Sequence, residues 1–244
     1  MSAKLWIAGA ACLLGACGDN IGELAYTWND DAILCSTPVD DYQEEPNWGR
    51  IDKEMREAEH YKWAALYHAH IPGETVKRET LEKLFDMADS HGLEYDTFRE
   101  LSPDATPHAA IAFAFDDSAV DNWAMVRDVL LEHDAKITLF VTRWFELSDE
   151  QKQQIAEFAA EGDDVEPHTV HHLNAGDYVN EHGMNAYIHD EVLPSFTALT
   201  DAGYPTPVSF AYPFGVHSPE IDKAVLESTG VRTVRTTPGE CDYR

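Results

Sequence analysis

The chain has 244 residues, of which 44% are hydrophobic, and it carries 17 Lys and Arg against 45 Asp and Glu, a formal net charge of −28. This composition suits one globular domain with a sizeable core and excludes wholesale disorder. A surface this acidic repels phosphate backbones, so we expect no nucleic-acid partner and no direct contact with an anionic membrane.

The N-terminus has the pattern of an export signal. Lys4 is followed by an uncharged run up to Cys17, which is too short to span a bilayer but has the length of a signal-peptide core. Residues 14–17, Leu-Gly-Ala-Cys, resemble the bacterial lipobox, which predicts a lipoprotein signal peptide over 1–16 and lipidation of Cys17. The protein would then be exported and anchored at the periplasmic face of the cell envelope, and Gly18 favours the outer membrane. The alternative is an ordinary signal peptide with Cys17 as an unmodified thiol.

The next segment has little pattern. Residues 18–46 are acidic, which predicts a tether with one short ordered piece at 32–36. From Trp48 apolar residues follow helical spacing and predict a helix. Residues 17–60 are therefore assigned to a tether and helix, ahead of a catalytic domain over 61–244.

The domain itself is predicted to alternate strands and helices. The patterns predict strands at 63–67, 109–115, 136–142, near 165, at 208–212 and at 231–236, and helices at 76–90, 122–132, 149–161, 189–202 and 220–228. Strands separated by helices of about ten to fifteen residues imply an α/β fold, a parallel sheet with helical crossovers. In such folds reacting residues collect at the carboxyl ends of the strands.

Two adjacent carboxylates follow the strand predicted at 109–115. Asp116 and Asp117 cannot both be buried at low cost, because an ionised carboxylate is destabilised by burial unless it is paired, hydrogen-bonded or metal-bound. One cation would stabilise both. The alternative is a strand end at which one Asp caps the next helix and the other is solvated.

Three imidazoles follow the strand predicted near residue 165. Neutral imidazole is a common ligand for zinc-like ions, and a compact turn could direct His168 and His172 at one centre. With one aspartate they would form a two-His, one-carboxylate site with open positions for water and substrate. The alternative is a polar loop in which His171 and His172 donate hydrogen bonds at a helix start.

These motifs and a third resemble those of a known family. Residues 114–118, Ala-Phe-Asp-Asp-Ser, are similar to the Thr-Phe-Asp-Asp-Gly motif of the polysaccharide deacetylases, the NodB-homology or carbohydrate esterase family 4 enzymes. Residues 168–172, His-Thr-Val-His-His, are similar to the family's His-Ser/Thr-x-x-His motif, and residues 210–215, Phe-Ala-Tyr-Pro-Phe-Gly, to its third motif, usually Arg-x-Pro-Tyr. The resemblance implies a distorted (β/α) barrel with fewer than eight repeats.

The resemblance also assigns roles to residues. Asp117, His168 and His172 would hold one divalent metal ion, expected to be Zn²⁺, and Asp116 would be the general base. This division is chemically sound, because a metal lowers the pKa of water and a carboxylate that does not ligate it can take the proton. The backbone N–H of Phe214 would stabilise the oxyanion.

Two features depart from the family pattern. The Arg of the third motif, which in the family pairs with the catalytic base, is Ala211 here, so Asp116 either lacks that partner or draws it from Arg232 or Arg235. The family's last motif, a strand ending in the His that protonates the leaving group, has no counterpart before Arg244.

That last strand has a counterpart near the N-terminus. Residues 64–68, Ala-Ala-Leu-Tyr-His, resemble the Leu-Thr-Tyr-His opening of the circularly permuted branch, which includes poly-N-acetylglucosamine deacetylases. This resemblance predicts His68 as the general acid. His70 is the competing imidazole, and a core or loop histidine without a catalytic role is the alternative.

Two cysteines remain beside Cys17 once the signal peptide is set aside. A disulfide between Cys35 and Cys241 would join the two ends of the domain in an oxidising periplasm and contribute about 5 kcal/mol in the chain-entropy model. Two free, separated thiols are the alternative, because spacing alone does not show proximity.

The sequence therefore predicts a monomeric, metal-dependent hydrolase that removes acetyl groups from a polysaccharide or oligosaccharide containing N-acetylglucosamine. An O-acetyl esterase of the xylan type on the same site is one alternative. A carbohydrate-binding lipoprotein that keeps the barrel without turnover is another, and Ala211 is the observation in its favour.

Overall fold

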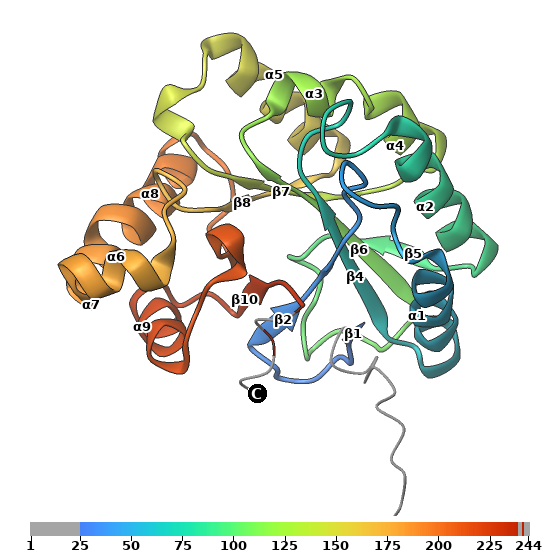
Figure 1. Cartoon of the computed structure of the whole chain (residues 1–244), viewed down its shortest axis with the longest axis horizontal. Helices are drawn as coiled ribbons and strands as arrows, with labels where there is room; N and C mark the ends of the chain where they lie inside the picture. Colours follow the sequence, from blue (N-terminus) through green and yellow to red (C-terminus); the bar gives the residue numbers. More distant parts are fainter. Residues whose placement is uncertain (1–24, 239–240, 242–244) are drawn as a thin grey trace, which may run out of the picture.

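The computed structural model describes residues 25–238 and residue 241. In this part of the chain, helices surround strands that converge on the centre of the molecule (Figure 1). None of the described helices is long and apolar enough to cross a membrane. The predicted signal peptide over 1–16 and the predicted lipidation of Cys17 lie outside the described residues.

The elements have the following bounds. The strands are β1 Ala25–Tyr26, β2 Ile33–Cys35, β3 Thr37–Pro38, β4 Ala64–Ala69, β5 Glu94–Asp96, β6 Ala110–Asp117, β7 Thr138–Val141, β8 Asp164–Pro167, β9 Ser209–Ala211 and β10 Thr233–Thr236. The α-helices are α1 Trp48–Tyr61, α2 Arg78–Ser90, α3 Val120–Ala124, α4 Arg127–Glu132, α5 Asp149–Glu161, α6 Ala175–His182, α7 Met184–Ala186, α8 Leu193–Asp201 and α9 Pro219–Thr229. Two short 3₁₀ helices, η2 Trp144–Glu146 and η4 Pro213–Gly215, and a π-helix, η3 Tyr187–Val192, complete the set.

The described strands form two sheets. In the larger sheet β1, β4, β6, β7 and β8 follow in that order, with β3 added to β4 and β5 to β6, and all pairings are parallel except β1 with β4. In the smaller sheet β10 lies between β2 and β9, both parallel to it. The two sheets and their helices make the distorted (β/α) barrel that the sequence predicts.

Alternation along β6 separates two hydrophobic cores. Its outward residues pack with the surrounding helices, and its inward residues belong to the barrel interior. The outward residues are Ile111, Phe113 and Phe115, and the inward ones are Ala110, Ala112 and Ala114. Because Asp116 continues the inward series, its carboxylate enters the barrel, and the small alanines below it leave room there.

The prediction of a tether in residues 18–46 is wrong for the described part of that segment. β1 and β3 pair with β4, and β2, the ordered piece predicted at 32–36, pairs with β10. Tyr26 and Leu34 are buried in the inner core. Strands of two or three residues are too short to show an alternating pattern, so the sequence does not reveal them.

Two predicted helices differ in form. The helix expected at 122–132 is divided between α3 and α4. The helix expected at 189–202 begins as the π-helix η3 and continues as α8, which has Pro194 in its first turn. Proline has no N–H to donate to the carbonyl four residues earlier, which favours this change of helical form.

Candidate active site

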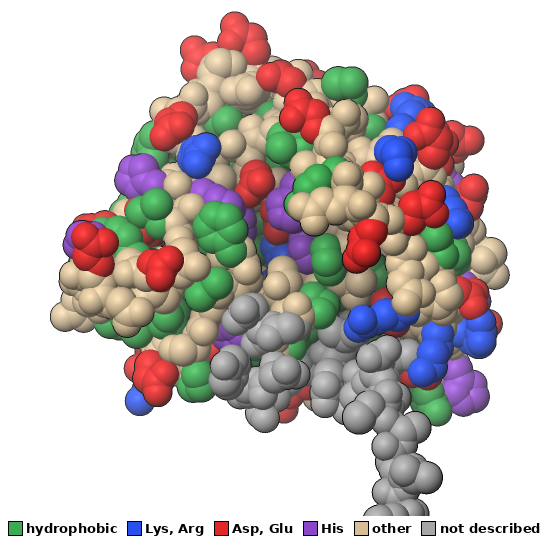
Figure 2. Space-filling model, viewed as in Figure 1, with side chains coloured by type: hydrophobic (Ala, Val, Ile, Leu, Met, Phe, Trp, Pro, Cys, Tyr) green, Lys and Arg blue, Asp and Glu red, His purple; other side chains and the backbone are tan. Residues whose placement is uncertain are grey.

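The predicted site residues gather at one end of the barrel. Asp116 and Asp117 end β6, His68 lies near the end of β4, and His168 follows β8. Because β4, β6 and β8 belong to one parallel sheet, their carboxyl ends meet at the same edge. Figure 2 shows histidine side chains around a hollow in the centre of this face.

Asp117, His168 and His172 form a cluster whose ligand atoms all lie within 4.8 Å of one another. His172 Nε2 is 2.9 Å from Asp117 Oδ1, and His168 Nε2 is 3.6 Å from the same oxygen. His168 Nδ1–H donates to the Ala211 carbonyl at 2.8 Å, which leaves the Nε2 lone pair directed at the cluster.

The backbone around this cluster adopts left-handed conformations. Asp117 has φ 87°, Thr169 φ 66° and His172 φ 61°. Such angles cost a residue with a side chain about 1–2 kcal/mol and persist where the surroundings enforce them. Here the His172 N–H donates to Thr169 Oγ1 at 3.1 Å and Thr142 Oγ1–H donates to the Thr169 carbonyl at 3.1 Å, so the turn is held from two sides.

The charge state of Asp117 suits a cation ligand. Burial raises the pKa of Asp117, but its pairing with His168 and His172 outweighs burial, and the pKa lies well below its usual value. Although both imidazole nitrogens lie close to it, the buried Oδ1 of Asp117 has no hydrogen-bond partner. One unsatisfied carboxylate oxygen and two imidazole nitrogens are a donor set that fits Zn²⁺.

Glu191 holds the loop that carries the two histidines. The Val170 N–H donates to the Glu191 carbonyl at 3.1 Å, and the His171 N–H and Nδ1–H donate to the Glu191 carboxylate at 2.9 and 2.6 Å. Glu191 is buried in the π-helix η3, whereas the His171 side chain is 57% exposed. His171 therefore anchors the loop and is not a member of the ligand cluster.

Asp116 is a buried carboxylate with one bound and one free oxygen. Arg235 donates to Asp116 Oδ2, and Asp116 Oδ1 has no hydrogen-bond partner. Burial raises the pKa of Asp116, but the Arg235 guanidinium outweighs burial and the pKa is lowered. Of the two arginines that the sequence offered, Arg235 is this partner, while Arg232 donates to the backbone carbonyls of Arg99 and Leu101.

His68 is buried beside this ion pair. Its Nδ1 is 2.8 Å from the Ser36 hydroxyl, which also accepts from Arg235 at 3.3 Å. Burial and the positive charge of Arg235 lower the pKa of His68 to about 3. His68 is therefore a neutral imidazole at pH 7.

His70 lies next to it but has a different environment. The His70 Nδ1–H donates to Asp40 Oδ2 at 2.5 Å, and the His70 N–H donates to Asp40 Oδ1 at 3.1 Å. Burial lowers the pKa of His70, but the bond to Asp40 and the charge of Asp116 raise it further, to about 9. Ring nitrogens of His68 and His70 and an oxygen of Asp116 lie within 4.8 Å of one another, so both imidazoles reach the site.

Phe214, the predicted oxyanion donor, lies in the turn η4 after β9. It has φ 60°, and its ring is 4.7 Å from the His172 ring. The next residue, Gly215, has φ 70°, and a Cβ there would collide with Thr237, so the turn requires glycine. The turn thus lies at the edge of the ligand cluster, and the role of its N–H stays a prediction.

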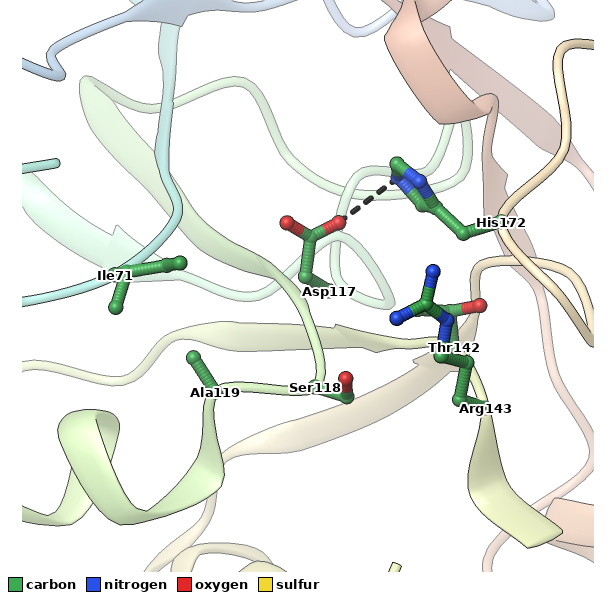
Figure 3. A pocket seen from close by; sticks show the side chains of 7 residues that line it. All are labelled: Ile71, Asp117, Ser118, Ala119, Thr142, Arg143 and His172. Atoms are coloured by element: carbon green, nitrogen blue, oxygen red, sulfur yellow. Dashed lines mark ion pairs between the residues drawn. The ribbon is translucent and has the colours of Figure 1, made fainter. Parts of the chain in front are cut away.

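The catalytic and metal-binding candidates face a cavity of about 610 Å³. It is lined by every predicted catalytic and metal-binding residue, together with Asp40, Tyr42, Glu44 and Arg235. A second cavity of about 210 Å³, whose lining is drawn in Figure 3, shares Ile71, Asp117 and His172 with the first. Both cavities therefore border the candidate metal site through Asp117 and His172.

Cys35 and Cys241 form the disulfide that the sequence left open, with their Cα atoms 6.2 Å apart. It joins the end of β2 to the chain that follows β10, beside the parallel pairing of those strands. It therefore braces the small sheet, whose inward residue Arg235 holds Asp116.

Sequence reasoning missed three residues that shape the site. Asp40 lies in the segment predicted as a tether, Ser36 ends the short ordered piece predicted within it, and Glu191 lies in a predicted helix. Each of them hydrogen-bonds a histidine that is 20 or more residues away in the sequence: Ser36 bonds His68, Asp40 bonds His70 and Glu191 bonds His171. Their polarity matches ordinary surface positions, so the sequence carried no signal that singles them out.

Comparisons with known proteins agree with this geometry. A sequence model of the family described as polysaccharide deacetylase matches residues 103–234. No curated protein matches the sequence.

Solved structures share the fold. The Streptococcus pyogenes deacetylase PplD in complex with acetate is 17% identical with a TM-score of 0.59, over 71% of this chain and 90% of that chain. IcaB from Ammonifex degensii is 19% identical with a TM-score of 0.59, over 70% and 82%. A de-N-acetylase from Aggregatibacter actinomycetemcomitans is 14% identical with a TM-score of 0.57, over 86% and 95%.

Proposed function

The chain belongs to the polysaccharide deacetylase family, and from this premise we propose that it removes N-acetyl groups from N-acetylglucosamine units with the help of one divalent metal ion, expected to be zinc. Family membership makes it a hydrolase of amide bonds in an acetylated polysaccharide; the metal and the sugar are the proposal. The observation that carries the proposal is the convergence of Asp117, His168 and His172 beside an ionised Asp116 with a free oxygen.

Asp117, His168 and His172 would hold the cation, which when bound supplies a Lewis acid for the acetyl carbonyl and lowers the pKa of water. Asp116 Oδ1 takes the proton from the attacking water, because it is the free oxygen of a carboxylate kept ionised by Arg235. The Phe214 N–H would donate to the developing oxyanion.

The leaving amine needs a proton when the carbon–nitrogen bond breaks. The sequence predicts His68 as the donor, but the surroundings of the two imidazoles favour the alternative, His70. A donor must carry its proton at working pH, and the pKa of His70, about 9, meets this condition, whereas that of His68, about 3, does not. Asp40 orients His70 through two hydrogen bonds.

The binding-only alternative loses its main support. It rested on Ala211 in place of the motif arginine, and Arg235 on the paired strand binds Asp116 instead. We further propose that the protein is an exported monomer, anchored through Cys17 at the periplasmic face of the cell envelope.

Acetate release with and without metal tests the proposal. Purified protein should contain about one zinc per chain, lose activity after chelation and recover it with Zn²⁺. It should release acetate from N-acetylglucosamine oligomers faster than from acetylated xylan. Faster release from xylan would support the O-acetyl esterase, and saccharide binding without any acetate release would overturn the proposed activity.

A further inference from the structure

Arg143 stands out among the described arginines because its guanidinium has no hydrogen-bond or ion-pair partner in the part of the chain that the structure describes. Within residues 25–238, Arg50, Arg56, Arg78, Arg99 and Arg127 each pair with an Asp or Glu. Arg235 pairs with Asp116, and Arg232 donates to two carbonyls. Among the described residues Arg143 is thus the one arginine without such a partner, and because its side chain is exposed, its guanidinium is free to bind an anionic ligand.

The position of Arg143 is fixed by the fold. It follows β7 at the carboxyl end of the sheet and has φ 51°. Its N–H donates to the Val170 carbonyl at 3.0 Å, and its carbonyl accepts from the Glu146 N–H at 2.8 Å. A left-handed arginine is unfavourable by itself, so these bonds hold the backbone of Arg143 in this conformation.

The side chain enters the smaller cavity beside the candidate metal site. That cavity, about 210 Å³, is lined by Arg143 together with Asp117 and His172 (Figure 3). In Figure 3 the Arg143 side chain extends from the end of β7 toward those two residues. Ser118 adds a hydroxyl to the same wall.

The charged groups of the two cavities differ in their pairing. In the larger cavity the one arginine, Arg235, is bound to Asp116, whereas in the smaller one Arg143 lies in the same lining as Asp117 without an ion pair to it. Guanidinium binds carboxylates through two parallel hydrogen bonds, and such bonds are strong when the charges are otherwise unpaired.

We propose that Arg143 forms a carboxylate subsite next to the reacting acetyl group. Two sources of the carboxylate fit the chemistry: a carboxylate-bearing sugar adjacent to the N-acetylglucosamine, or the acetate that the reaction releases. This inference rests on the proposed function, because it places the subsite relative to the reacting group.

The experiment compares wild type with Arg143→Gln on two matched oligomers, one of N-acetylglucosamine alone and one in which alternate sugars carry a carboxylate. If the polymer supplies the carboxylate, wild type prefers the second oligomer, and Arg143→Gln lowers kcat/KM on it by about tenfold while sparing the first. If acetate is the ligand, Arg143→Gln instead raises the inhibition constant of acetate by about tenfold, at constant ionic strength.

Controls separate charge from structure. Arg143→Lys keeps the positive charge and should therefore show a smaller loss than Arg143→Gln in either assay. Arg56→Gln, on the exposed face of α1, should behave as wild type in both. Equal kinetics and equal acetate inhibition in wild type and Arg143→Gln would overturn the subsite. Absence of acetate release from both oligomers by wild type would instead refute the proposed function.

Discussion

Arg235 lies directly beside Ala211 on the paired strands β10 and β9, and its guanidinium binds Asp116 inside the barrel. The family resemblance expects an arginine at Ala211 with this task. An arginine on the neighbouring strand of the small sheet thus binds the carboxylate that the motif arginine of the family would bind. Ser36 and the face of Phe140 help to hold it there.

Replacing Arg235 with Met should leave Asp116 buried without a partner. Removing one member of a buried ion pair costs about 3–5 kcal/mol of folding stability. Because Arg235 lowers the pKa of Asp116, its loss raises that pKa, and the acidic limb of the kcat/KM profile should move to higher pH. The double variant Ala211→Arg, Arg235→Ala should restore part of both properties. An acidic limb that stays in place in Arg235→Met would show that Asp116 is not the base.

The sequence left Arg232 and Arg235 open because it does not give the orientation of β10. In the structure Val234 packs in a separate hydrophobic cluster with Phe210 and Val225, so its neighbour Arg235 faces the opposite side of the strand, toward the barrel interior. Asp40 was hidden for another reason. It is one acid among many in a segment without pattern, and only the fold brings it to His70, thirty residues away.

The barrel and the ligand cluster were predictable because each rests on a local signal. Strands and helices alternate from β6 onward, and the acidic and histidine motifs follow strands of one parallel sheet. The two- and three-residue strands β1, β2 and β3 were not predictable as a set, since they are stabilised by the edges of β4 and β10 and not by their own pattern.

Asp116→Asn should abolish turnover without loss of the metal. The amide has nearly the same shape as the carboxylate but cannot accept the proton, and loss of a general base costs about 100- to 10,000-fold in rate. The rate of acetate release and the zinc content of the same sample provide the check. Wild-type rates would assign the base to another residue.

Asp117→Ala combined with His168→Ala should abolish metal binding. The double variant removes the carboxylate oxygen and one of the two nitrogens of the cluster, which leaves too few ligands for a tight site. Elemental analysis should find zinc near zero, compared with about one ion per chain in wild type. His182→Ala is the matched control, since that exposed imidazole at the end of α6 lies outside the cluster and outside the loop that carries it. A full zinc load in the double variant would contradict the assignment.

Glu191→Ala should weaken metal binding although Glu191 is not a ligand. It removes two hydrogen bonds to His171, whose position sets the turn between His168 and His172. Loss of a group that hydrogen-bonds a ligating residue reduces metal affinity by about 10- to 100-fold, and because Glu191 acts on the ligands only through His171, we expect a loss of about tenfold. Competition with a chelating dye measures this directly, and Asp190→Asn, on the same π-helix, is the control. Unchanged zinc affinity in Glu191→Ala would show that the loop holds its shape without it.

The proton donor can be identified by comparing the two imidazoles. An amine leaves poorly unless it is protonated, whereas an activated alcohol leaves without help. His70→Gln should therefore lower deacetylation of N-acetylglucosamine oligomers by about 100-fold or more, with a milder effect on an activated acetate ester. His68→Gln should have the smaller effect, because His68 is neutral at pH 7.

The pH profile adds a readout that a merely structural histidine would not change. The donor works only when protonated, so wild-type activity should fall as pH rises through the His70 pKa, about 9. Asp40→Asn removes the negative charge that raises this pKa, so the alkaline limb of kcat/KM should move to lower pH while the acidic limb stays. If His68→Gln is inactive and His70→Gln retains wild-type rates and the same alkaline limb, the donor is His68, as the motif resemblance predicts, and Asp40 has only a structural role.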